Sequence, residues 1–544
     1  MHSLIQSVGA LFSRVLVTPI RALLFVNVLS VVALIYLSNV QVLPLRLWDF
    51  IFFVILFFLI ALYRSGFVFA FLVGMLPLET VNLAPVEWGI NIRPYQFLAV
   101  LLIASLLVRL ATKRSTWPLF AVHWQDAVLG LFLFSTCLMI PFLPFPELHS
   151  VAVKQGIILL SFGLLYFLAR IFLKKESDIR IAVLFFLSSI FVVLCYSLWQ
   201  SLRFAWHLPS FEMMSGRPNG TFPEADFLGG VLAMILSGMV PFGLAFFFHE
   251  KSTMMKKFLF AVFFFSLSLI LILSVARSGW LAAGVGMIAG GGMFFLKNGI
   301  FSALRNWDAG VLRKVIFGKL FIITPLFLAL MTVIMFHLTA FNLFDRGESI
   351  ASGLQKITVS CLSSDTALPE TLHTIDELAL NGCRHILLEE IAEETQLGNS
   401  VREVYRSDPN ISVRKQIYAQ SFELISAHPI SGIGFGNASH FLGIDGNGRG
   451  LNASNVFLEV WLGSGLLAFI AFLIFWFSFP IVLLKQVIQT SHQNDSVVAI
   501  SLFASWVAMT VFNCFNSGLL LGSLWIFFAM LVWRVHVCNS SSVS

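Results

Sequence analysis

The chain has 544 residues with a net charge of +6, and 58% of them are hydrophobic while only 11% are charged. Soluble globular proteins carry about 25% charged residues, so the composition excludes that class and predicts a protein embedded in a membrane. The apolar runs are continuous and close to the roughly 20 residues that a helix needs to cross a bilayer, whereas a β-barrel would show alternating segments of about ten residues. We therefore expect an all-α polytopic membrane protein with about 12–14 transmembrane helices.

Apolar runs along the chain predict about fourteen membrane spans. They lie near residues 22–38, 48–63, 66–80, 95–112, 127–144, 156–173, 180–202, 225–248, 257–274, 279–297, 318–338, 455–484, 496–513 and 517–535. The pair around Arg64 is short and could be re-entrant. The spans divide the chain into an N-terminal bundle (1–335), a large polar loop (336–454) and C-terminal helices (455–544).

The connections between spans are alternately rich and poor in lysine and arginine. If the N-terminus is cytoplasmic, the inner connections receive clusters such as Lys174/Lys175 and Lys256/Lys257, whereas the short outer connections hold few cations. By the positive-inside rule this asymmetry predicts a cytoplasmic C-terminus and places the polar loop outside the cytoplasm.

The polar loop reads as several parts. Residues 339–369 look irregular, and residues 370–404 read as short amphipathic helices. Ser412 can cap a following helix, which places Arg414 in the first turn, where the helix dipole disfavours a cation unless an anion is bound. Cys361 and Cys383 could form a disulfide if the loop is extracytoplasmic, although two cysteines are a thin pattern.

Two outer arginines are candidates for an anion site. Arg277 falls between two spans with almost no connecting loop, and Arg217 lies in a Gly/Pro-rich turn before a span. Either residue could instead be ordinary, Arg277 by extending to outer lipid headgroups and Arg217 as a loop arginine.

The ordered set of motifs ARSGW (276–280), RGES (346–349), VRKQIYAQSFELISAHPISGIGFGN (413–437) and SNVFLEVWLGSGLLAF (454–469) resembles the O-antigen ligase / Wzy-type polymerase superfamily. The turn GRPNGTFPEADFLGG (216–230) is similar to that family's Gly-Thr-Phe turn. The resemblance covers roughly residues 200–480 by motif and the flanking spans by architecture.

The resemblance implies a metal-independent, GT-C-like glycosyltransferase in a bacterial inner membrane, with its large loop in the periplasm. Such enzymes take a glycan from undecaprenyl diphosphate and pass it to lipid A-core, to a second lipid-linked glycan or sometimes to protein. Arginine suits a diphosphate because its planar guanidinium makes bidentate contacts with phosphate oxygens. By motif position, Arg277 and Arg414 look like family arginines, and Arg217 is a weaker match.

Family ligases usually carry a His-Asn pair where the loop re-enters the membrane, but this chain has Ser454 and Asn455 there. Serine cannot hold a proton as a base near neutral pH, so a base must come from elsewhere or catalysis must rest on the leaving group. Candidate bases are His440, Glu459, Asp226 and Glu224, each of which also has a structural explanation.

We assign Arg277, Arg414, His440 and Glu459 as catalytic candidates. The substrate-binding candidates are Arg217, Arg346, Asn455, Ser454, Gly434 and Gly436. The sequence has no P-loop and no Cys/His metal cluster, and we expect no cofactor and no nucleic-acid partner. There are two alternatives. The protein is a transporter or flippase for lipid-linked glycans, or it is an inactive scaffold relative.

Overall fold

The computed structural model describes most of the chain. The described residues are 19–116, 118–206, 208, 216–248, 253–299, 309–339, 341, 343, 352–362, 369, 371–372, 376–386, 390–407, 409–444, 450–489 and 493–541. Within them, eleven helices are long and apolar enough to cross a membrane, which confirms the predicted class of all-α polytopic membrane protein.

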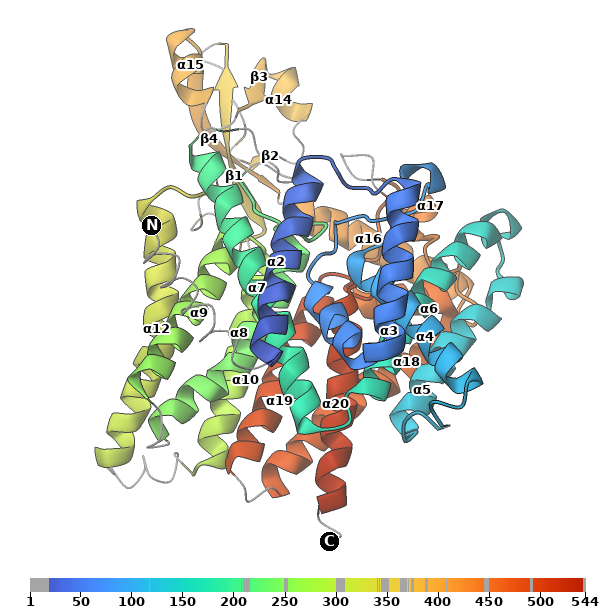
Figure 1. Ribbon diagram of the computed structural model, residues 1–544. Coiled ribbons are helices and arrows are strands. Elements are labelled where there is room, and N and C mark those ends of the chain that lie inside the picture. The colour runs from blue at the N-terminus through green and yellow to red at the C-terminus, as the bar shows by residue number, and fades with distance from the viewer. Residues whose placement is uncertain are drawn as a thin grey trace, which may run out of the picture.

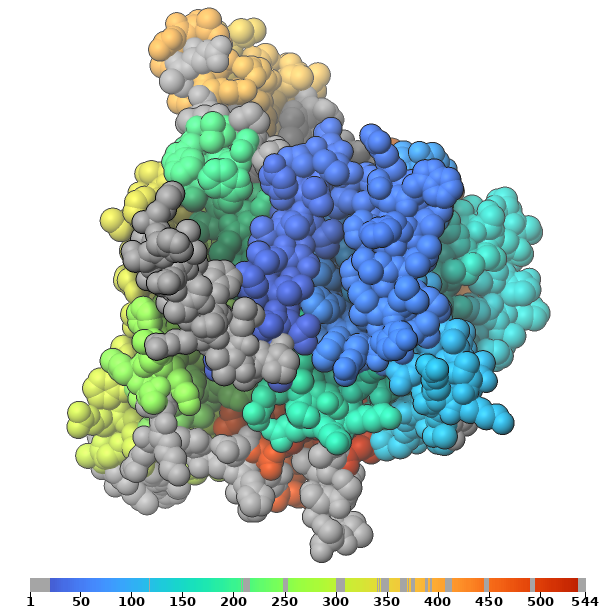
Figure 2. Space-filling model, in the orientation of Figure 1, coloured from blue at the N-terminus to red at the C-terminus, as the bar shows by residue number. Residues whose placement is uncertain are grey.

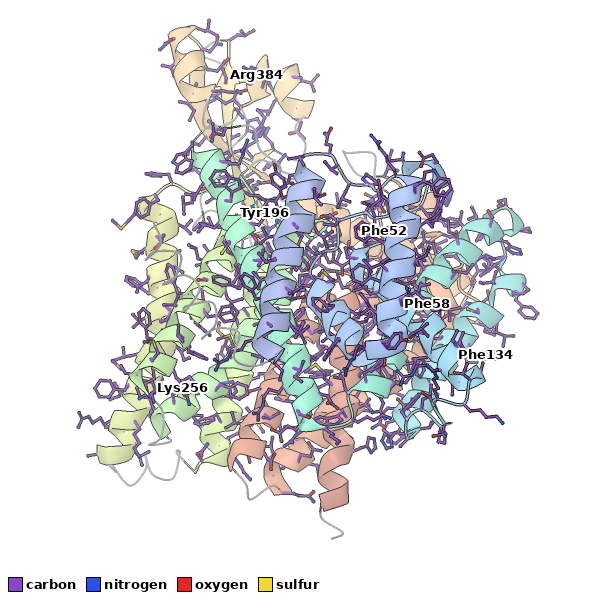
Figure 3. All side chains as sticks on the ribbon, viewed as in Figure 1. Phe52, Phe58, Phe134, Tyr196, Lys256 and Arg384 are labelled. Atoms are coloured by element: carbon purple, nitrogen blue, oxygen red, sulfur yellow. A yellow bond between two sulfur atoms is a disulfide. The ribbon has the colours of Figure 1, made fainter. Side chains whose placement is uncertain are left out.

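The helices form one bundle (Figure 1). They are α2 (Pro19–Asn39), α3 (Leu47–Met75), α4 (Pro94–Ala111), α5 (Trp124–Leu138), α6 (His149–Phe172), α7 (Glu176–Ala205), α8 (Ala225–Phe248), α9 (Met254–Leu273), α10 (Arg277–Lys297), α12 (Ala309–Met335), α18 (Val456–Gln489), α19 (Gln493–Asn513) and α20 (Gly522–Ser541). Three short 3₁₀ turns, Val86–Trp88, Ile140–Phe142 and Pro146–Leu148, lie in the connections. Apolar side chains such as Phe52 and Phe134 project outward from the helices, as expected for surfaces that face lipid (Figure 3).

Helix α3 bends at Arg64, where the backbone leaves helical geometry (φ −136°, ψ 55°). Ser65 accepts a hydrogen bond at 2.8 Å from Arg109, near the end of α4. Glu79, after the end of α3, accepts one at 2.9 Å from Tyr95, at the start of α4. The second half of α3 therefore runs antiparallel to α4, and the bend falls at the arginine that separates the two short predicted spans.

The two ends of the bundle differ in charge. At one end, which we call the loop end, residues 336–454 leave the helices. At the opposite end, Lys297 donates a hydrogen bond to the carbonyl of Ile488 at 3.3 Å, and Lys174 accepts one from Trp533 at 3.1 Å. The C-terminus also lies at this opposite end (Figure 1). Lys174 and Lys297, from two of the connections that the positive-inside argument groups together, thus lie at one end.

Helices α8, α10 and α19 pack closely through small residues. A Cβ atom added to Gly279 of α10 would lie 3.0 Å from the backbone carbonyl carbon of Gly229 in α8. Three turns further along α10, a Cβ on Gly290 would lie 2.8 Å from Ala504 of α19. Small residues let membrane helices approach until their backbones touch, and here that contact fixes the start of α10 against α8.

The polar loop contains a sheet that the sequence did not predict. Strands β1 (Leu354–Cys361), β2 (Thr371–Leu372), β3 (Cys383–His385) and β4 (Ser400–Ser407) form a sheet in the order β2-β4-β1-β3. β1 is antiparallel to β4 and β3, with Leu354 opposite Ser407 and Cys361 opposite Cys383, and β2 is parallel to β4. This small domain projects from the loop end of the bundle (Figures 1 and 2).

Two interpretations of the loop are therefore wrong in part. Residues 354–361, taken as irregular, form the central strand, and residues 370–404 contain strands as well as the short helices α14 (Asp376–Leu380) and α15 (Ile391–Gln396). The pattern misled because these strands depend on partners distant in sequence. Cys361 and Cys383 form a disulfide, the pairing that the sequence left open.

The rest of the loop returns to the bundle through α16 (Pro409–Ala427) and α17 (Ala438–Leu442). Helix α16 begins at Pro409, so Ser412 is not its cap, and Arg414 lies in the second turn instead of the first. The predicted apolar face is also only partly correct: Ile417 and Ile425 are buried, whereas Val413 and Phe422 are 40% and 52% exposed. The helix dipole is therefore weaker evidence for an anion at Arg414, and the role of this residue is inferred from the residues that surround it.

Candidate functional site

The turn between α19 and α20, residues 514–521, lies at the centre of the polar contacts at the loop end; we call it the α19–α20 turn. Asn516 donates a hydrogen bond to the Ser278 hydroxyl at 2.9 Å, next to Arg277. The carbonyl oxygen of Cys514 accepts hydrogen bonds from Asn455 at 3.0 Å and from Tyr418 at 3.4 Å. The turn therefore joins α10, α16 and α18, which are distant in sequence.

Arg277 is the first residue of α10 and is half-buried. It follows a three-residue connection in which Val275 has φ +51°, a left-handed conformation that β-branched residues rarely adopt. Such backbone strain persists only where the surrounding structure enforces it, and it is frequent at functional sites. Here the close contact of Gly279 with α8 and the Asn516–Ser278 hydrogen bond hold the helix start in place.

Arg217 contacts the same connection from the other side. Its Nε donates a hydrogen bond to the carbonyl of Ser274 at 3.0 Å, and its guanidinium forms an ion pair with Asp226 at 3.0 Å. The Arg217 side chain is 16% exposed and that of Asp226 33%. Two candidate arginines thus lie on either side of the α9–α10 connection, and Asp226, proposed as a base, is the ion-pair partner of Arg217.

Arg414 approaches the α19–α20 turn from α16. Its guanidinium carbon lies 5.8 Å from the centroid of the Phe515 ring. Tyr418, one helical turn later, hydrogen-bonds the backbone of Cys514 and fixes α16 to the same turn. Arg414 therefore lies against Phe515, and the next residue, Asn516, is the one that hydrogen-bonds Ser278 beside Arg277.

The return into the membrane is capped by the Asn455 side chain. Its Oδ1 accepts hydrogen bonds from the amides of Phe457 at 2.9 Å and Leu458 at 3.2 Å, and its Nδ2 holds the Cys514 carbonyl. Ser454 precedes it with φ +48°, and its amide bonds the Asn452 side chain at 2.8 Å. Asn455 thus has a clear positioning role at the α19–α20 turn.

Glu459 lies one helical turn after Asn455, whose carbonyl accepts the Glu459 amide at 2.9 Å. Its carboxylate lies close to the Ser517 side chain of the α19–α20 turn. The other oxygen, Oε2, is buried and has no hydrogen-bond partner among the described residues. A buried carboxylate oxygen without a partner is unusual and is a feature expected where a substrate supplies the missing partner.

A buried polar cluster that the sequence analysis missed fixes the far end of the α19–α20 turn. Arg93 forms an ion pair with the fully buried Glu79 at 2.7 Å and donates a hydrogen bond to the Leu520 carbonyl at 3.1 Å. Glu79 also accepts a hydrogen bond from the Gly522 amide at 3.1 Å. The sequence signal that could have indicated this turn is the segment Asn513–Gly518, in which two asparagines, a serine and a glycine interrupt the apolar sequence.

The remaining predicted site residues lie elsewhere. His440 is exposed on α17, and a Cβ on Gly436 would meet the side chain of Gln155 in α6, 2.3 Å away. A Cβ on Gly434 would lie 2.7 Å from Leu143, so both glycines pack the loop against the start of α6. Glu224 is exposed just before α8, and Arg346 is outside the described residues.

The described residues contain no group of three or more His, Cys, Asp or Glu side chains that would hold a metal ion. The site consists of arginines, amides, hydroxyls and one buried carboxylate. Such a set can bind an oxyanion and move a proton.

Residues 260–473 match the family model described as O-antigen ligase. This match begins within α9 and covers α10, α12, the polar loop and the first half of α18, and it supports the similarity of this part of the chain to the O-antigen ligase / Wzy-type superfamily. The match supports an O-antigen ligase/polymerase-type function in general, and the eleven long apolar helices indicate a multi-pass membrane protein. No curated protein and no solved structure gives a significant match.

Proposed function

We propose that the protein is a GT-C-type glycosyltransferase that moves a glycan from undecaprenyl diphosphate to a lipid- or glycan-linked acceptor at the loop end. The observation that supports this most is that two arginines lie beside the α19–α20 turn. Arg277 adjoins Ser278, which is bonded to that turn, and Arg414 lies over Phe515 within it. Arg217 bonds Ser274 in the neighbouring α9–α10 connection. Arg277 and Arg414, from separate elements at a membrane interface and with the Arg217–Asp226 ion pair beside them, form a suitable site for a lipid-anchored diphosphate.

The arginines act on the leaving group. The acceptor hydroxyl oxygen attacks the anomeric carbon, the bond from that carbon to the diphosphate oxygen breaks, and negative charge grows on the diphosphate. Cations already fixed in place stabilise this charge more in the transition state than in the ground state. In this proposal the guanidinium groups supply the positive charge, so no metal ion is required.

Glu459 accepts the proton of the acceptor hydroxyl. It replaces the histidine that the family carries at the position of Ser454, from one helical turn further along α18. Its buried, unpartnered Oε2 beside the α19–α20 turn supports this role, because a general base must have an oxygen free to accept the hydroxyl proton.

The loop end is periplasmic in this proposal and the membrane is the bacterial inner membrane. The concentration of lysine and arginine at the opposite end supports this orientation. The acceptor is then lipid A-core for a ligase or a second lipid-linked glycan for a polymerase. A deletion strain distinguishes them: unligated long polymer on the lipid carrier indicates a ligase, and single repeats without long polymer indicate a polymerase.

The proposal is tested with membranes that contain the protein and a labelled undecaprenyl-diphosphate glycan. We expect glycosyl transfer by the wild type and its loss in Arg277→Ala and Arg414→Ala. Arg46→Ala, an exposed arginine at the same end of the bundle, is the matched control and should retain transfer. Movement of the donor across the membrane without a new glycosidic bond would instead identify a transporter.

A further inference from the structure

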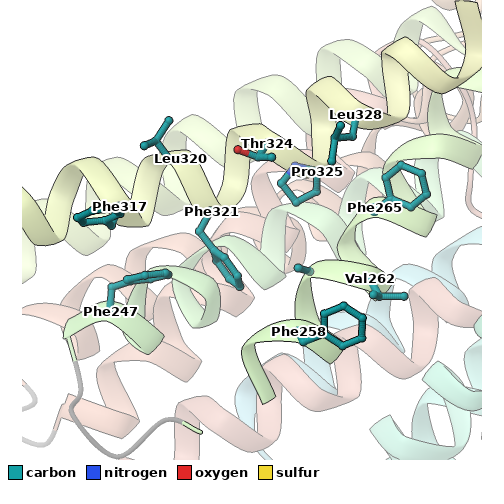
Figure 4. Close-up of a pocket in the computed structure, with 11 residues that line it drawn as sticks. Phe247, Phe258, Val262, Phe265, Phe317, Leu320, Phe321, Thr324, Pro325 and Leu328 are labelled. Carbon is teal, nitrogen blue, oxygen red and sulfur yellow. The ribbon is translucent and has the colours of Figure 1, made fainter. Parts of the chain in front are cut away.

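An apolar groove lies between the end of α8 and the facing sides of α9 and α12 (Figure 4). Its volume is about 560 Å³. It is lined by Phe247, Phe258, Ala261, Val262, Phe265, Phe317, Leu320, Phe321, Thr324, Pro325 and Leu328.

The groove is open to the lipid along its length. Phe258 is 61% exposed, Leu320 51% and Leu328 50%, so the lining side chains form a surface channel and not an enclosed core. From Phe317 to Leu328 the groove follows about 17 Å of α12 at the helical rise. This is close to half of the roughly 30 Å hydrocarbon core, so the groove spans about one leaflet.

Cations stand at the mouth of the groove on its own aromatic rings. The ammonium nitrogen of Lys257 lies 4.6 Å from the centroid of Phe247, and the guanidinium carbon of Arg313 lies 5.6 Å from that of Phe317. Both rings line the groove. Lys256 and Lys314 adjoin them in sequence, and Figure 3 shows Lys256 at the end of the bundle away from Arg384.

Within the described helices, the charged residues near this mouth are cations. Helices α9 and α12 both begin there, with their positive dipole ends, and neither helix contains an Asp or Glu. Cations near a helix N-terminus are unfavourable unless an anion offsets them. Lys257, Arg313 and two helix N-termini beside an apolar channel therefore form a site for a ligand with an anionic head and a hydrocarbon tail.

We propose that this groove binds one anionic phospholipid of the leaflet at the opposite end. One acyl chain lies along Phe258, Leu320 and Leu328, and the phosphate contacts Lys257 and Arg313. The site is distinct from the donor site at the loop end and does not depend on the proposed transfer reaction.

The test uses native mass spectrometry of the purified full chain with phosphatidylglycerol or phosphatidylcholine. We expect one saturable phosphatidylglycerol and much weaker retention of phosphatidylcholine. The double variant Lys257→Gln/Arg313→Gln should weaken phosphatidylglycerol binding by about tenfold or more, because each cation near an anionic headgroup contributes about a fivefold effect. Lys319→Gln, whose ammonium lies over Phe295 outside the groove, is the charge-matched control and should bind normally.

A second pair of variants tests the groove itself. Thr324→Trp fills the channel and should reduce phosphatidylglycerol retention, whereas Ile323→Trp adds the same bulk at an exposed neighbouring position that does not line the groove and should not. Equal retention by the double variant and the wild type, or equal effects of the two tryptophans, would overturn the site. Displacement of phosphatidylglycerol by a polyprenyl phosphate at lower concentration would overturn the assignment of the occupant.

Discussion

Glu459 is the residue on which the proton-transfer part of the account depends. It reaches the site from one helical turn after Asn455, and its Oε2 has no partner among the described residues. From the sequence, Glu459 was only one of several candidate carboxylates. Its closeness to Ser517 depends on how α18 packs against the α19–α20 turn, which the sequence does not show. Its contact with the α19–α20 turn distinguishes it from Asp226, which is paired with Arg217.

Glu459→Gln keeps the size and the hydrogen-bonding ability of the side chain but removes the base. We expect turnover to fall by about 10²–10⁴-fold, the usual contribution of a general base, while binding of the lipid-linked donor is retained. Transfer rates of the purified variant and its affinity for the donor would be measured together. Turnover close to that of the wild type would remove Glu459 from the mechanism.

Glu394 gives the sheet domain a pH-dependent stability. Its carboxylate accepts hydrogen bonds from Ser360, from Asn399 at 2.8 Å and from Arg384 at 2.6 Å. These bonds, that from Ser360 foremost, lower the pKa of Glu394 from its ordinary value of 4.5 to about 2. Because the folded pKa is depressed, the stabilisation is complete above about pH 4.5 and is lost as the pH falls toward 2.

Hydrogen exchange of strands β1 and β4 between pH 6 and pH 3 would measure this effect, after correction for the intrinsic exchange rate. We expect protection to decrease below about pH 4.5 in the wild type. In Glu394→Gln the protection should be lower at pH 6 and should change little over the same range. A wild-type decrease that persists unchanged in this variant would assign it to another group.

At the scale of elements, the helices follow from apolar length alone, whereas the sheet does not. Strand β1, LQKITVSC, shows no regular alternation of buried and exposed positions. Its pairing with β4 and β3 and the Cys361–Cys383 disulfide are long-range, so local sequence could not indicate them. The start of α16 was misplaced for a simpler reason, since Pro409 begins the helix ahead of the capping serine.

The close contact between α8 and α10 provides a prediction about the position of Arg277. Gly279→Ala would place a methyl group 3.0 Å from the Gly229 carbonyl carbon, so α10 must shift and carry Arg277 with it. We expect a loss of stability of about 1–3 kcal/mol, typical of overpacking, and a decrease in turnover. Thermal unfolding in detergent and transfer assays would measure both.

Gly284→Ala is the matched control for this variant. It lies on the same helix with no atom within 4 Å of the added Cβ. Alanine has the higher helix propensity, so this variant should be at least as stable as the wild type and fully active. Equal destabilisation by both variants would mean that the α8–α10 contact does not position the site.

At the scale of the whole molecule, the protein has two chemically different ends. The loop end gathers Arg277, Arg414, Asn455 and Glu459 around the α19–α20 turn, and the opposite end gathers the basic clusters and the lipid groove. The arginines could be proposed from motif position. The α19–α20 turn, and the buried Glu79–Arg93 pair that fixes it, required the folded chain because they join segments more than 400 residues apart.

The most direct test of the account is a transfer assay with the purified protein in lipid nanodiscs. A defined undecaprenyl-diphosphate glycan and an acceptor glycan would be supplied, in buffer with a metal chelator, and both products quantified. We predict one undecaprenyl diphosphate released for each glycan transferred. Arg277→Ala should lower this rate by about 10²–10³-fold, as expected for the loss of a group that stabilises transition-state charge, while Arg46→Ala does not. Transfer that requires a metal ion, or that proceeds equally well without Arg277, would contradict the account.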